Sequence, residues 1–343
     1  MTALHRRIRQ SLSAAIVLLA ACSIAGGQSK VGTTAAQFLG IGVGPRAIAM
    51  GGAFSASSAD VSALYWNPGA FVQANSSQMM FSNTDWLVGT KFRWFGFMYN
   101  LDGTNALGLS LTQLAYGDEE VTTTSSPEGT GARWSAQDLA IALSYSRRMT
   151  DQFSMGGSAK YVNQSVWNES ASSFTFDLGL LFITQFNDMR LGMSMANFGG
   201  ELALDGRDLY NRVDIDPSNP GGNKTLVGKL KTDAWPMPLL FRVGVAMDVV
   251  RNNDVRITLA GDAIRPSDNI GTVNVGTELA WHDLLFARGG YNSLFDPNSE
   301  AGLALGGGVR YKMDNLGSLE VDYAFNKFGA FDNLNTISLS IAF

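Results

Sequence analysis

From residue 77 onward, apolar positions alternate with small or polar positions for about ten residues at a time. The alternation is clearest between Phe174 and Phe182, where five apolar side chains share one face and Thr175, Asp177 and Gly179 share the other. Such a period of two predicts strands with two unlike faces. The pattern recurs at residues 107–112, 139–146, 255–262, 303–311, 319–325 and 336–343, the last segment ending in Phe343.

The connections between these segments alternate between short turns and mostly longer polar loops. Counted with a connection at 88–89, they number thirteen and predict about fourteen strands. We therefore expect an all-β fold, a transmembrane antiparallel β-barrel with both termini on its periplasmic side. Short turns are predicted at 100–105, 148–152, 187–190, 251–254, 282–283 and 313–317, and longer loops at 116–133, 163–172, 197–237, 262–271, 292–301 and 326–335.

The first 27 residues have the pattern of a secretory signal peptide. A basic start precedes an apolar run from Leu12 to Ala21, and small residues continue to Gly27, so we expect cleavage near Ala25 or Gly27. A second interpretation stays open, because residues 19–22 resemble a lipobox in which Cys22 would carry a lipid. After residue 27 there is no run of about 18 apolar residues, and an exported chain without such a run favours a barrel of the outer membrane.

Charge and composition exclude several classes of function. The net charge of −5 gives no basic patch for nucleic acid, and a single cysteine excludes a disulfide framework and a Cys-based zinc site. The two histidines, His5 and His282, leave a Ser-His-Asp system with one candidate, so we expect no enzyme, no cofactor and no metal. The spacing Asp214-x-Asp216-x-Ser218 hints at a calcium loop, but it lacks the glycine and the acid of that motif.

Residues 40–71 do not alternate and are rich in glycine, alanine and serine. We predict that residues 28–76 form a plug with short helices inside a barrel of residues 77–343. Asp60 is expected to cap a short helix that ends at Trp66, because Pro68 disfavours helical backbone before it. Arg46 is the single cation here and, if buried, needs a carboxylate partner.

Charged residues on the predicted inner face of the barrel are candidates for fixing this plug. The acids that could pair with Arg46 are Asp177, Asp262, Glu278, Glu320 and Asp322. We interpret the set as a structural ladder of charges, and the alternative is a polar conduit. The cations predicted on the inner face are Arg93, Lys160, Arg242, Arg256, Arg288 and Arg310.

The stretch from Phe38 to Pro68 resembles the PorV/PorQ family of outer-membrane proteins. The family pattern runs F-L-x-I-G, then R-A-x-A-M-G-x-A, then D-x-x-A-L-Y-W-N-P-A, and Gly69 departs from its final Ala as a small change. The resemblance implies a fourteen-stranded barrel of the FadL type with an N-terminal plug. The matching residues with an expected plug role are Arg46, Gly51, Gly52, Asp60, Trp66, Asn67 and Pro68.

The resemblance also carries two functional hypotheses. PorV members serve the type IX secretion system, where they bind the C-terminal domain of exported cargo and the translocon, whereas FadL relatives move hydrophobic small molecules. We expect a PorV-like, non-enzymatic component of protein secretion, with FadL-like transport as the alternative. Outer-membrane lipid and the barrel assembly machinery, through Phe343, are the other expected partners. A filled lumen with apolar outer loops favours docking, and an apolar pocket above the plug favours transport.

Overall fold

The computed structural model describes residues 30–74, 76–216, 218, 225–296, 299–313, 317–329, 331 and 333–343. The predicted signal peptide and Cys22 lie outside these residues. Among the described residues, no helix is long and apolar enough to cross a membrane.

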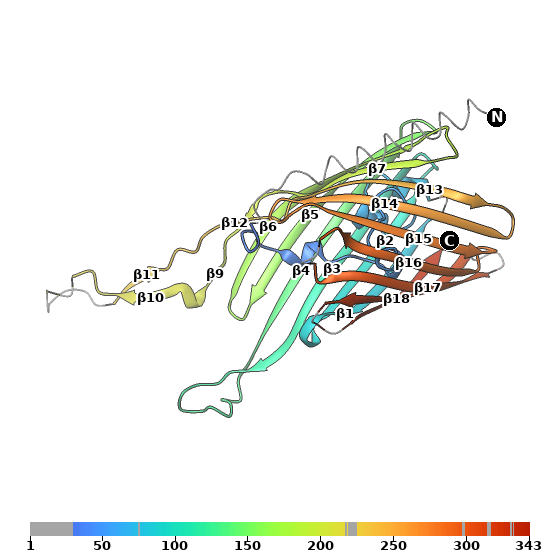
Figure 1. Cartoon of the computed structure of the whole chain (residues 1–343). Helices are drawn as coiled ribbons and strands as arrows, with labels where there is room; N and C mark the ends of the chain where they lie inside the picture. Colours follow the sequence, from blue (N-terminus) through green and yellow to red (C-terminus); the bar gives the residue numbers. More distant parts are fainter. Residues whose placement is uncertain are drawn as a thin grey trace.

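Fourteen antiparallel strands form one closed barrel (Figure 1). The first strand pairs with the last, since Phe81 lies opposite Leu339, and β5 pairs with β6 to complete the ring. The predicted fold class and strand count are confirmed. The barrel strands are β1 (Gln78–Asp85), β2 (Lys91–Asn100), β3 (Asn105–Glu120), β4 (Arg133–Arg148), β5 (Phe153–Val166), β6 (Glu169–Ile183), β7 (Arg190–Gly199), β13 (Leu240–Arg251), β14 (Val255–Pro266), β15 (Thr272–Trp281), β16 (Leu285–Leu294), β17 (Ala301–Met313), β18 (Gly317–Phe328) and β19 (Leu334–Ala342).

Side chains alternate between an exposed outer face and a buried inner face, as the period of two requires. In β6, Phe174 and Phe176 are exposed, whereas Thr175 and Asp177 are buried. In β2, Phe92 and Trp94 point inward, so Arg93 between them lies on the outer face. The prediction that Arg93 lines the lumen is therefore wrong, because the two aromatic side chains set the register of this strand.

We call the two ends of the barrel the short-turn end, which carries Phe343, and the long-loop end. One predicted long loop, 163–172, is instead a tight hairpin: β5 continues to Val166 and β6 begins at Glu169. Trp167 turns the chain in the left-handed region with φ 52°. The polar residues that suggested a loop pair across these two strands, which are, with β3 and β4, the longest strands of the wall.

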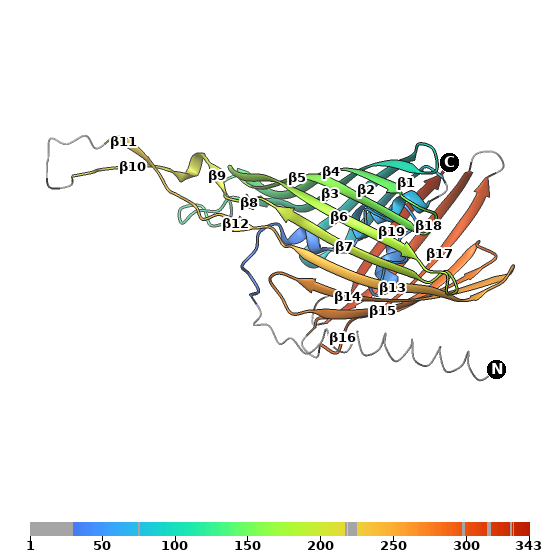
Figure 2. The ribbon, with the colours of Figure 1, turned by 90° about the horizontal axis from the view of Figure 1, so that it is seen from above.

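The connection from β7 to β13 forms an arm that projects from the long-loop end (Figures 1 and 2). At its root, β9 pairs with β6, and the Asn168 side chain donates a hydrogen bond to Asp208 at 2.7 Å. Farther out, β10 and β11 form a two-stranded ribbon. The elements of the arm are β8 (Glu201–Leu202), β9 (Asp205–Gly206), η4 (Arg207–Leu209), β10 (Tyr210–Val213), β11 (Leu226–Lys229) and β12 (Trp235–Pro236).

The N-terminal segment runs inside the ring of strands, where Figure 2 shows its short helices. Most of its side chains between Val43 and Ala74 are buried, and glycine, proline and small residues keep each helix to a turn or so. Its helices are η1 (Gln37–Gly40), α2 (Pro45–Ala49), α3 (Ala63–Trp66) and η2 (Phe71–Gln73), and η3 (Leu87–Gly89) lies in the first hairpin.

The two described ends of the chain lie at opposite ends of the barrel. The Lys30 amide donates to the Asp268 carbonyl at the long-loop end, whereas Phe343 pairs with Ser77 at the short-turn end. The segment therefore descends the lumen before β1 begins. The prediction that both termini are periplasmic stays a prediction, because the N-terminus lies outside the described residues.

Candidate functional site: the plug and its contacts with the wall

The Trp66-Asn67-Pro68 turn joins the plug to β6 and β7. The Asn67 amide donates to the carbonyls of Ser55 and Leu180, at 2.8 and 2.9 Å, and its oxygen accepts from the Gly69 amide. The Trp66 indole donates to the Val43 carbonyl at 2.9 Å. Asn67 is fully buried, so a single amide satisfies polar groups of both plug and wall that would otherwise be unpaired.

Backbone contact explains the glycine at position 69. A Cβ on Gly69 would lie 2.4 Å from the Gly179 carbonyl oxygen of β6. The exchange of the family's alanine for Gly69 is thus not a small change in this chain. Gly51, with φ 64°, also faces strand backbone, since a Cβ there would lie 2.7 Å from the Tyr291 nitrogen. The plug motif is built for close approach of backbones.

Asp60 holds the start of α3 and the Arg46 side chain together. Ser62, not Asp60, occupies the N-cap position, which corrects the prediction. One Asp60 oxygen accepts from the Ser62 amide at 2.9 Å, and the other accepts from Arg46 at 2.7 Å. As predicted, the short helix stops before Pro68, with Asn67 in extended backbone.

Glu278 of β15 is the carboxylate that receives Arg46 from the plug. The Arg46 Nε and Nη2 atoms donate to its two oxygens at 2.8 and 3.0 Å, in the bidentate geometry that favours arginine. Glu278 also accepts from Arg256 at 3.1 Å and Arg288 at 2.7 Å. Its side chain is fully buried, so three guanidinium groups depend on one carboxylate.

The network continues around the wall from Arg288. This guanidinium also pairs with Asp322 and, at 3.4 Å, with Glu320. Glu320 in turn pairs with Arg310 at 2.6 Å. The predicted ladder residues Arg256, Glu278, Arg288, Arg310, Glu320 and Asp322 are therefore brought together near the short-turn end.

Two of the predicted acids lie elsewhere. Asp262 accepts from the backbone amides of Phe54 and Ser55, at 3.1 and 2.8 Å, and so orients the plug without a cation. Asp177 pairs with Lys160 at 2.9 Å. Sequence spacing identified both residues as inward-facing but did not distinguish which carboxylate Arg46 would meet.

Arg242 of β13 contacts the plug through aromatic rings. Its guanidinium lies 5.2 Å from the ring centroids of both Tyr65 and Trp66, in cation–π geometry. Its Nη2 atom is 3.4 Å from the Tyr65 hydroxyl, and no carboxylate among the described residues forms an ion pair with it. The sequence placed Arg242 on the inner face but carried no signal for this aromatic partner.

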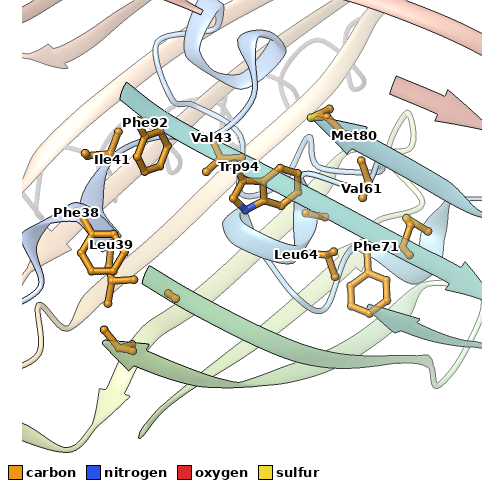
Figure 3. Packing of buried hydrophobic residues seen from close by; sticks show 14 of the residues in the cluster. Phe38, Leu39, Ile41, Val43, Val61, Leu64, Phe71, Met80, Phe92 and Trp94 are labelled. Carbon is orange, nitrogen blue, oxygen red and sulfur yellow. The ribbon is translucent and has the colours of Figure 1, made fainter. Parts of the chain in front are cut away.

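Above these polar contacts, apolar side chains fill the lumen. Phe38, Leu39 and Ile41 of the N-terminal segment belong to one buried cluster with Phe92 and Trp94 of β2 (Figure 3). Val162 of the wall and two arm-root residues join the same cluster, so the arm and the N-terminal segment share a core. Leu202 and Met237 are those arm-root residues.

The mouth of the barrel is crossed by residues 33–37. The side chains of Thr34 and Gln37 both donate to Asp268 at 2.7 Å, and the Ala35 amide donates to the Pro236 carbonyl of the arm root at 2.9 Å. On the opposite side, the Ala36 amide donates to the Gln164 side chain of β5 at 3.0 Å. Residues 33–37 thus connect the arm, strand β5 and the loop between β14 and β15.

Two surface hollows lie away from this filled lumen. One, of about 320 Å³, is polar and lies at the short-turn end between Asn100, Arg148 and Phe343. The other, of about 410 Å³, is apolar and lies on the outer wall between Leu107, Leu143 and Phe176. Neither opens into the cluster around Phe38.

Other predicted chemistry gives no assembled site among the described residues. His282 lies exposed in a short turn, 3.6 Å from Asp254. The Asp216 amide donates to Asp214 within the arm, and the part of the chain that is described holds no group of three or more potential metal ligands.

Comparison with known proteins identifies the family. The model of the type IX secretion system protein PorV matches residues 25–211, more than half of the chain. This protein belongs to the PorV family. The match covers the plug, the strands through β7 and the first part of the arm. No curated protein sequence matches the chain significantly.

The fold of this PorV-family chain is similar to that of three solved channels. The toluene transporter TbuX of Ralstonia pickettii is 12% identical, with a TM-score of 0.54 over 88% of this chain and 98% of that one. The toluene transporter TodX of Pseudomonas putida is 15% identical, with a TM-score of 0.54 over 88% and 97%. The monoaromatic hydrocarbon channel CymD is 16% identical, with a TM-score of 0.55 over 88% and 98%. The chain is thus an outer-membrane β-barrel of the PorV family with a FadL-like fold.

Proposed function

We propose that this protein is a non-enzymatic component of a type IX-type secretion pathway that binds translocon or cargo partners at its long-loop end, which faces the outside of the cell. One observation carries the proposal: the chain fills its own upper lumen while the arm exposes apolar side chains. Phe38 and Leu39 occupy the space that a solute would need. Exposed apolar surface outside the membrane is typical of a protein interface.

The β10–β11 ribbon is the proposed docking element. Val213 and Leu226 lie opposite each other on one face of the ribbon, and both are exposed. A two-stranded ribbon is marginally stable alone, so a partner that covers this face would order it. Asn211, on the same face, provides a polar control position.

A pull-down from detergent-solubilised outer membrane tests the proposal. We expect the parent chain and Asn211→Ser to retain a very large translocon subunit or a cargo C-terminal domain, identified by mass spectrometry. The double variant Val213→Ser/Leu226→Ser should lose at least about tenfold of this recovery, which corresponds to about 1.4 kcal/mol. Equal recovery by all three proteins would contradict the proposal.

FadL-like transport of hydrophobic small molecules is the second candidate. It is favoured by the apolar wall residues Phe92, Leu114 and Val162, which would line a cavity if residues 37–41 withdrew. The same purified protein distinguishes the two candidates. A stoichiometric bound hydrophobic molecule without any protein partner would favour transport.

A further inference from the structure

The outer face of the barrel becomes polar at a different height on different strands. Measured from the short-turn end of its own strand and leaving out the terminal residue itself, the first polar outward residue lies five residues up in β1 at Asn83, seven in β2 at Arg93 and eight in β3 at Gln113. In β19 the equivalent residue, Asn335, also lies seven residues up. These four strands are neighbours at the closing seam of the barrel.

On the neighbouring strands β4 to β6, which we call the tall side, apolar residues continue higher. Seven residues above the short-turn end, the outward positions are Ile141 in β4 and Phe176 in β6, both exposed. Two residues further up, Leu139 and Phe174 are still apolar. Arg93 in β2 therefore lies as many residues above the short-turn end as Ile141 in β4 and Phe176 in β6.

Among the described residues of the wall, none neutralises the charge of Arg93. Its register neighbours on the two adjacent strands are Asn83 and Gln113, and no ion pair or hydrogen bond joins its guanidinium to any described residue. Two residues higher, Lys91 pairs with Asp85 at 2.5 Å. A cation facing hydrocarbon is unfavourable, and the penalty falls near the headgroups.

Strand length shows the same difference between the seam and the strands beside it. β19, β1 and β2 have 9, 8 and 10 residues, whereas β3 to β6 have 14 to 16; β7, β15 and β16, elsewhere in the ring, have 10 each. Eight residues at about 3.3 Å each extend roughly 26 Å. Tilted by about 40°, they cross only about 20 Å of membrane, which is less than the apolar band of about 25 Å usual for outer-membrane barrels.

We propose that the seam formed by β19, β1 and β2 is a thin side of the barrel, where the bilayer is locally compressed and Arg93 contacts the phosphate groups of lipids. Compression of this kind is the response expected when a hydrophobic surface is shorter than the membrane. The tall side, around β4 to β6, contacts a bilayer of ordinary thickness. The inference concerns the lipid-facing surface and does not depend on the secretion partner.

Depth-dependent fluorescence quenching tests this asymmetry. Single-cysteine variants Arg93→Cys, Ile141→Cys and Phe176→Cys are made in a Cys22→Ser background, labelled with a nitrobenzoxadiazole probe and refolded into phosphatidylcholine vesicles. The lipid carries bromine near the middle of its acyl chains. We expect quenching at position 93 to be about threefold weaker than at 141 and 176. Equal quenching at the three positions would overturn the proposal.

A charge variant gives a second, probe-free measurement. Arg93→Leu extends the apolar band of β2 upward, so the ratio of folded yield in 18-carbon to 12-carbon phosphatidylcholine vesicles should rise about threefold. The matched control is Lys327→Leu, because Lys327 lies ten residues up β18, at the height where the outer face is polar elsewhere. An unchanged ratio for Arg93→Leu would also contradict the proposal, and electrophoretic heat-modifiability verifies that each variant folds.

Discussion

The lower and upper parts of the N-terminal segment are held in the barrel by different chemistry. Residues 44–74 pack apolar side chains such as Leu64 and Phe71 in the lumen and add directional contacts to the wall, chiefly the Arg46–Glu278 pair and the Asn67 amide. Residues 30–43 are fixed by apolar packing of Phe38, Leu39 and Ile41, with a few hydrogen bonds at the mouth. A directional network has one correct geometry, whereas apolar packing tolerates local rearrangement. We therefore expect the lower part to behave as one unit with the wall and the upper part to open locally.

Removal of the shared carboxylate should have the largest effect. Glu278→Gln removes the negative charge shared by Arg46, Arg256 and Arg288 and replaces one acceptor oxygen with an NH2 donor, which is expected to cost about 3–5 kcal/mol of unfolding free energy. Urea unfolding of the barrel in vesicles measures this loss. Asp85→Asn, at the exposed Lys91 pair, is the control and should change stability by about 1 kcal/mol or less. A similar small change for Glu278→Gln would remove the distinction between the two parts.

Truncation in the upper part should act locally. Phe38→Ala removes a buried ring from the apolar cluster and should weaken the attachment of residues 30–41 by about 3 kcal/mol. Since this segment can open while the strands stay paired, the effect should appear as faster amide exchange of residues 30–41 with the barrel's urea midpoint unchanged. A global loss of stability equal to that of Glu278→Gln would show that the two parts are not separate.

A methyl group at the closest backbone contact should have an intermediate global effect. Gly69→Ala forces a Cβ against the Gly179 carbonyl at 2.4 Å, so we expect about 1–3 kcal/mol of destabilisation. Gly40→Ala is the matched control from the upper part, because a Cβ there has no neighbour within 4 Å. Equal urea midpoints for the two variants would contradict the close backbone packing at position 69.

The smallest expected effect is a pH dependence of amide exchange in the arm. The hydrogen bond from Lys229 lowers the pKa of the exposed Asp205 carboxyl, so this contact stabilises the arm above the ordinary aspartate pKa of about 4 and is lost as pH falls below it. Amide exchange in β10 and β11 should therefore accelerate below about pH 4, relative to its intrinsic rate. Asp205→Asn should abolish that pH dependence while the plug amides stay unaffected.

The sequence by itself determined the alternating wall, the strand number and the inward position of Glu278, Arg288 and Asp262, because period-two patterning is a local property of each strand. It also marked the plug, since residues 40–71 break that pattern. The sequence pattern placed Arg93 on the wrong face of β2, because the face depends on whether Phe92 and Trp94 point into the lumen. The pattern also predicted a loop at 163–172, because polar strands that extend beyond a membrane resemble loops. Only the tertiary structure decided that Arg46 meets Glu278, that Gly69 touches Gly179, and that the segment before the plug crosses the long-loop mouth. Those contacts join residues more than a hundred positions apart, and closure of the barrel, which no local pattern encodes, brings them together.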